Sequence, residues 1–102
     1  MLIDHMPLRI ASGVLAVTTI ESVLRSPSYH ACGWQILDRW AFNSPRRLRA
    51  LEAQGELVLL GRLLEQQILE HETLISPTGL AQRGQGLAEH EVLALSGIST
   101  EL

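Results

Sequence analysis

The spacing of apolar residues along the chain predicts an all-α protein. The strongest pattern lies between positions 45 and 75, where apolar residues recur every three or four positions. An α-helix has about 3.6 residues per turn, so residues with this spacing share one face. The face comprises Leu57, Leu60, Leu64, Ile68 and Ile75. His71 completes the row, and Leu59 and Leu63 make the stripe wider than a surface helix needs. We therefore expect the face to pack in the core or against a second copy of the chain.

Two earlier segments also have helical patterns. Residues 8–25 place apolar side chains near one side of a predicted helix. The run from Val14 to Ile20 is rich in β-branched residues, however, and a strand is the alternative there. The segment 27–42 carries a helical apolar stripe that includes Trp34 and Leu37.

Proline and glycine mark the expected ends of these helices. Ser-Pro occurs three times: Ser26-Pro27, Ser44-Pro45 and Ser76-Pro77. Proline suits the first position of a helix and disfavours helix in the residue before it, so each pair can end one element and begin the next. Gly55 favours a further break, with a new helix from Glu56. The alternative is that Gly55 and Gly61 lie within one helix where another backbone approaches closely.

The C-terminal quarter has a weaker pattern. Residues 76–86 are rich in Gly and Gln and are predicted to form a loop. Residues 87–95 suit a short helix within a C-terminal element 87–102. We expect a single domain, 1–102, built as a small helical bundle of three to four main helices with a short C-terminal helix.

Composition bounds the class of protein. The chain is 46% hydrophobic and 19% charged, which is typical of a folded globular domain. The longest apolar run, Ile10 to Ile20, is too short to cross a bilayer and follows no basic segment, so we expect neither a membrane protein nor a signal peptide. Cys32 stands alone, which fits a reducing, cytoplasmic location.

Charge is distributed unevenly between the two halves of the chain. Residues 1–50 carry six Arg and three acidic residues, a net charge of +3, whereas residues 51–102 carry two Arg and eight Glu, a net charge of −6. The overall charge is −3. The second half is therefore predicted to present an acidic face.

Aromatic residues and arginines gather in one stretch. All four aromatic side chains lie between Tyr29 and Phe42. The predicted partner-binding residues are Arg39, Trp40, Arg46, Arg47 and Arg49. Arginines beside the exposed amides at the start of a helix can hold carboxylates or phosphates, so we expect a protein partner with an acidic surface. The alternatives are that the arginines are solvated or pair with the chain's own acidic half, and that the aromatic residues form the core.

A helix-turn-helix is the second interpretation of this stretch. Residues 28–42 would form the supporting helix and residues 45–54 the helix that reads DNA. Nucleic-acid binding is nevertheless disfavoured, because the isoelectric point is about 5.7 and nucleic-acid-binding domains normally carry a basic surface.

No pattern of catalytic or metal-binding residues is evident. His30 and Cys32 are two positions apart and point in different directions on a helix, and His71 lacks a ligand type four residues away. The sequence contains no HExxH, CxxC, phosphate-binding loop or nucleophile elbow. We expect no metal, no cofactor and no catalytic residue.

Taken together, these patterns favour a non-enzymatic protein–protein interaction module. An adaptor, a chaperone-like subunit or an inhibitor of a larger assembly fits them, with homo-oligomers formed through the Leu57–Ile75 face. A small nucleic-acid-binding regulator that uses residues 28–54 is the alternative.

Overall fold

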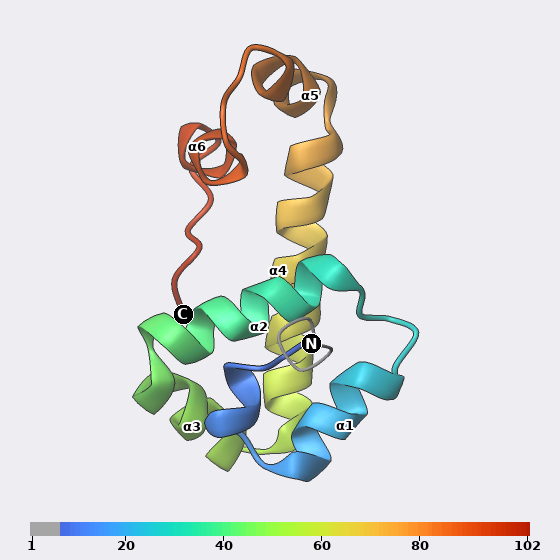
Figure 1. Cartoon of the computed structure of the whole chain (residues 1–102), viewed down its shortest axis with the longest axis vertical. Helices are drawn as coiled ribbons and strands as arrows, with labels where there is room; N and C mark the ends of the chain where they lie inside the picture. Colours follow the sequence, from blue (N-terminus) through green and yellow to red (C-terminus); the bar gives the residue numbers. More distant parts are fainter. Residues whose placement is uncertain (1–6) are drawn as a thin grey trace.

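The computed structural model describes residues 7–102, and the regular secondary structure in this range is entirely helical (Figure 1). The elements are a short 3-10 helix η2 (Ala11–Gly13) and the α-helices α1 (Val17–Arg25), α2 (Ala31–Asn43), α3 (Pro45–Ala53), α4 (Glu56–Ile75), α5 (Pro77–Gly84) and α6 (Glu89–Leu95). The all-α prediction is confirmed. The described chain forms six α-helices, however, and not the predicted three to four. None of them is long and apolar enough to span a membrane.

The twenty-residue helix α4 is the axis of the molecule. At a rise of 1.5 Å per residue it is about 30 Å long. In Figure 1, α2 crosses α4 near its middle, α1 and α3 lie towards one end, and α5 and α6 lie towards the other. After α6 an extended segment, residues 96–102, returns along α4 to the end of α2.

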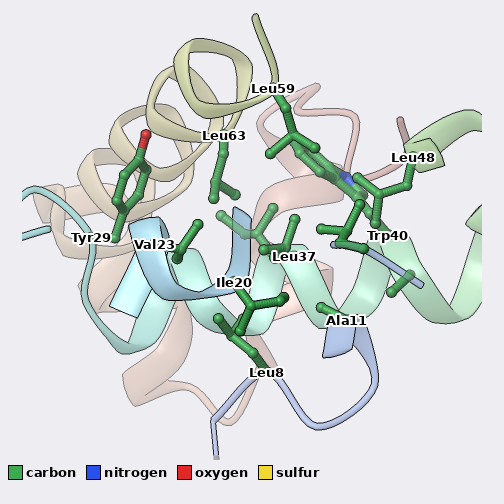
Figure 2. Close-up of a cluster of buried hydrophobic side chains, with 13 residues drawn as sticks. Leu8, Ala11, Ile20, Val23, Tyr29, Leu37, Trp40, Leu48, Leu59 and Leu63 are labelled. Carbon is green, nitrogen blue, oxygen red and sulfur yellow. The ribbon is translucent and has the colours of Figure 1, made fainter. Parts of the chain in front are cut away.

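The main core lies where α2 crosses the first half of α4. Trp40, Leu37, Leu59 and Leu63 are all fully buried there, and η2, α1 and α3 close it from outside (Figure 2). Burial of each such side chain stabilises the fold by roughly 1.5–3 kcal/mol. Two of the four aromatic side chains, Trp40 and Tyr29, therefore belong to the core.

A second, smaller core lies at the other end of α4. It consists of Leu74 from α4 and Val92 and Leu93 from α6, with Leu87 and Ile98 packed at its edge. This cluster holds α5 and α6 against the end of α4.

The prediction of one helix over residues 8–25 is wrong. The chain forms η2, then turns through residues 14–16, with Ala16 extended, before α1 begins at Val17. The Ala16 amide donates to Glu52 Oε2 at 2.9 Å, and Arg49 Nε donates to the Val14 carbonyl at 3.4 Å. The break is thus held by side chains of α3. The strand alternative is also wrong, because the β-branched run lies within α1 and the turn before it.

The prediction of a loop over residues 76–86 is wrong as well. Most of this segment is α5, which begins at Pro77. The Ser76 hydroxyl accepts a hydrogen bond from the Gly79 amide at 3.0 Å, and this satisfies one of the amides at the helix start.

The remaining boundaries follow the expected signals closely. The break at Gly55 is confirmed, with a φ of 136° that only glycine adopts readily. Pro45 begins α3, and the predicted C-terminal helix is α6. Ser26 ends α1, but α2 begins only at Ala31, with His30 as its N-cap.

Candidate interaction surface

One side of α4 exposes large apolar side chains. We call this side the outer face. Its apolar members, with their exposed fractions, are Leu57 (81%), Val58 (46%), Ile68 (50%), Leu69 (45%) and Ile75 (49%). Single exposed apolar residues are ordinary on protein surfaces, but five on one side of a single helix make that side the candidate contact site. They lie in two pairs, 57–58 and 68–69, with Ile75 beyond them, and Gly61, Glu65 and Glu72 lie between these groups.

The predicted apolar face of α4 is divided between solvent and core. Leu57, Ile68 and Ile75 are on the outer face, so they do not belong to the core. Leu60 and Leu64 are half-buried and pack against the main core. Of the two roles predicted for this set, the core role is wrong for the three exposed residues, and the dimer role stays a prediction.

The side of α4 that faces inward includes three buried polar residues. Gln66, Gln67 and Glu70 are each no more than 3% exposed. Gln67 Oε1 accepts from the His30 amide at 3.1 Å, and Gln67 Nε2 donates to the Ser28 carbonyl at 2.8 Å. Because Gln66, Gln67 and Glu70 lie on the inward side of α4, that side has fewer apolar residues in the sequence than a core-facing side normally has. For this reason the apolar pattern does not identify the side of the helix that forms the core.

The side chains of Arg39 and Trp40 form hydrogen bonds within the protein. The Arg39 guanidinium donates to both carboxylate oxygens of Glu70, at 3.2 and 2.5 Å. Arg39 Nε and Trp40 Nε1 both donate to the Thr100 carbonyl, at 3.0 and 3.1 Å. Trp40 is fully buried, so its predicted contact with a partner is wrong, and Arg39 is committed to the ion pair.

The three arginines of α3 are exposed. Arg47 Nη1 donates to the Leu102 carbonyl at 2.9 Å, and Arg49 makes the long hydrogen bond to Val14. Arg46 forms no hydrogen bond or ion pair within residues 7–102 and lines a hollow of ≈ 330 Å³ at the start of α3.

The geometry around α3 differs from a helix-turn-helix. Only Ser44 separates the end of α2 from the start of α3. A helix-turn-helix joins its two helices by three or four residues.

An open groove of ≈ 720 Å³ runs between the outer face of α4 and the start of the C-terminal segment. Its lining residues are Glu65, Ile68, Leu69, Glu72, Thr73, Ser76, Ser96 and Ile98. Ile98 also packs against the smaller core, so this wall of the groove is fixed to the fold.

Two carboxylates stand in the groove. Glu65 and Glu72 are exposed, and neither forms a hydrogen bond or ion pair within the described residues. Arg62 is the one basic residue of α4, but it donates to Gln66 Oε1 at 2.9 Å and its guanidinium lies 5.0 Å from the centre of the Trp40 ring. The groove therefore combines apolar side chains with two unneutralised negative charges.

A cleft on the opposite side of α4 brings together the residues that the metal and thiol interpretations considered. Hollows of ≈ 360 and ≈ 300 Å³ meet at Cys32, and the rings of His30 and His71 lie 5.1 Å apart, edge to face. Burial raises the pKa of the Cys32 thiol, and the charges of Glu70 and Glu89 raise it further. A raised pKa keeps the thiol protonated and weakly nucleophilic. No group of three or more His, Cys, Asp and Glu side chains in residues 7–102 is arranged to hold a metal ion.

No protein-family model, no curated protein and no solved structure matches the chain.

Proposed function

We propose that the protein is a non-enzymatic protein–protein interaction module that binds a helix of another chain on the outer face of α4. The observation that carries this proposal is the set of five apolar side chains of the outer face that the protein's own fold leaves 45–81% exposed. Soluble monomers rarely expose large contiguous apolar patches unless a partner covers them.

The environment of α4 supports the same proposal. The inner side of the helix is fixed by two cores and by the hydrogen bonds of Gln66, Gln67 and Glu70. A face held in this way is ordered before binding, so little conformational entropy is lost when a partner docks. Adaptors commonly take an amphipathic helix into such a groove, with anchor residues one and two turns apart.

A second copy of the chain is the second candidate for the partner. Leu57, Gly61, Leu64, Ile68, His71 and Ile75 follow the alternating spacing of four and three residues of a coiled-coil seam. A Cβ at Gly61 meets nothing within 4 Å, so the protein's own packing does not require glycine there. Glycine at a helix interior costs about 0.5–1 kcal/mol, and it permits close approach of a partner helix.

The arginines of α3 are proposed as a secondary contact for an acidic partner. Arg46, Arg47 and Arg49 are exposed, and Arg46 and Arg47 line a hollow at the start of their helix. Arg46 is the residue whose loss tests this contact most cleanly, because Arg47 and Arg49 also hold the C-terminal segment and the turn before α1.

Site-specific photocrosslinking tests the main proposal. A benzophenone amino acid replaces Ile68 on the outer face, or Phe42, which is 73% exposed on α2, as the matched control. In the cells that naturally make the protein, we expect one discrete adduct from position 68 and none from position 42. An adduct of twice the 11.3 kDa chain mass identifies a second copy, and any other discrete mass identifies a different protein. The same pattern of adducts from both positions, or none from either, contradicts the proposal.

A further inference from the structure

We propose that the occupant of the groove on α4 is a basic amphipathic helix of a different protein. Its apolar side chains contact Ile68 and Leu69, and its Arg or Lys side chains pair with Glu65 and Glu72. This inference rests on the proposed function and deepens it by stating the chemistry of the partner.

The two carboxylates set the charge pattern that the partner must carry. Glu65 and Glu72 are seven residues apart, which places them on the same side of α4 and about 10 Å apart along its axis. Ile68 and Leu69 lie between them in the lining of the groove. A helix with two basic side chains seven residues apart and apolar side chains between them matches this order. Arginine suits it best, because its guanidinium can bind a carboxylate through two parallel hydrogen bonds.

The same charges disfavour a second copy of the chain in this groove. A symmetric pair of outer faces would bring four carboxylates into one interface, and like charges juxtaposed in an interface weaken association. Arg62 cannot neutralise them, because it is held by Gln66 and lies over the Trp40 ring. Charge complementarity therefore selects a different, basic chain.

The length of the outer face fits a partner helix of modest length. The apolar outer face extends from Leu57 to Ile75, which corresponds to about 27 Å along the helix axis. Ser96 and Ile98 form the opposite wall along the second half of this length. A partner helix of about 18 residues spans the face. The two exposed carboxylates of the groove disfavour a phosphate-rich partner, because like charges repel.

Designed peptides test the partner chemistry directly. Two fluorescent 18-residue helices share one leucine and isoleucine stripe; the basic peptide has Arg at the two flanking positions seven residues apart, and the acidic peptide has Glu at the same positions. Fluorescence anisotropy with the wild-type protein measures the Kd of each. We expect the basic peptide to bind at least about tenfold more tightly and its Kd to rise with salt.

Variants of the protein locate the contact. Glu65→Gln and Glu72→Gln should each weaken the basic peptide about two- to fivefold. Glu21→Gln, which removes one exposed carboxylate from α1, should leave its Kd unchanged. Ile68→Ser should weaken both peptides, because it removes apolar contact and leaves the charges in place.

The outcomes separate this inference from the proposed function. If the acidic peptide binds as tightly as the basic one and Ile68→Ser weakens both, the partner chemistry is wrong and the contact surface stands. If light scattering shows a dimer that Ile68→Ser dissociates while neither peptide binds, the occupant is a second copy, and the inference is again wrong. If neither peptide binds and the protein stays monomeric at all concentrations, the inference and the proposed function both fail.

Discussion

At the scale of single residues, a glycine of one helix packs directly against a buried side-chain amide of another. Gly33 of α2 lies against Gln67 of α4, and a Cβ at position 33 would overlap the Gln67 side-chain oxygen. Because that oxygen accepts from the His30 amide, the side chain cannot move aside without losing a buried hydrogen bond. Glycine is therefore required at position 33 by packing, although it lowers intrinsic helix stability.

The requirement for glycine at position 33 can be tested by comparing the stability of two glycine-to-alanine variants. Gly33→Ala should lower the free energy of unfolding by about 1–3 kcal/mol, because the added methyl group displaces Gln67. Gly61→Ala, in open space on α4, should raise it by up to about 1 kcal/mol through better helix propensity. Urea unfolding followed by circular dichroism gives both values. Equal effects of the same sign would show that packing at Gly33 is loose.

At the scale of helices, local signals explain some boundaries and fail at others. The break at Gly55 follows from a backbone angle that glycine favours, so the sequence suffices to predict it. The turn before α1 depends on Glu52 and Arg49, which lie about 35 positions further along the chain, and no local pattern contains that information. The start of α5 was marked by Ser76 and Pro77, but the glycine-rich composition after them favoured a loop.

Two serines before prolines provide a test at this scale. Ser76→Ala should destabilise the protein by about 0.5–2 kcal/mol, because the Ser76 hydroxyl accepts from the Gly79 amide at the start of α5. Ser44→Ala should have a smaller effect, because the Ser44 side chain makes no such bond at the start of α3. Thermal unfolding of the two variants gives the comparison. A Ser44 effect as large as that of Ser76 would contradict the assigned capping.

The candidate site shows how far periodicity can predict a surface. The apolar pattern predicts the helix that carries the exposed apolar residues, and three members of the predicted stripe, Leu57, Ile68 and Ile75, are among them. It could not decide which side of α4 faces the core, because the helix is apolar on almost every side and buries Gln66, Gln67 and Glu70. For the two acidic residues of the groove, Glu65 and Glu72, the sequence predicts only that they belong to the acidic second half of the chain.

At the scale of the whole molecule, one ion pair with a buried carboxylate joins segments that are distant in sequence. Arg39 of α2 binds Glu70 of α4 and the Thr100 carbonyl of the C-terminal segment. Gln66 adds hydrogen bonds to Glu70 at 2.6 Å and to the Ser99 carbonyl at 2.8 Å. This network holds the C-terminal segment across the junction of α2 and α4.

Removal of one partner should destabilise the entire assembly. Glu70→Ala removes the acceptor of two Arg39 hydrogen bonds and one Gln66 hydrogen bond, so we expect a loss of about 1.5–3 kcal/mol in the free energy of unfolding. The bonds from Arg39 and Gln66 to the Thr100 and Ser99 carbonyls remain. Glu72→Ala removes an exposed carboxylate two residues away and should change stability by no more than about 0.5 kcal/mol. Chemical denaturation of both variants measures the difference. Similar values for the two would show that the ion pair contributes little.

The presence of two cores along α4 implies that the protein does not open as a single unit. The main core buries thirteen apolar side chains, whereas the core beneath α6 buries three, so far less free energy opposes local unfolding of the C-terminal end. Ile98, which forms part of the groove wall, belongs to this less stable region. A helix bound against α4 and Ile98 would therefore slow hydrogen exchange in α6, and the partner would stabilise the region of the fold that opens first.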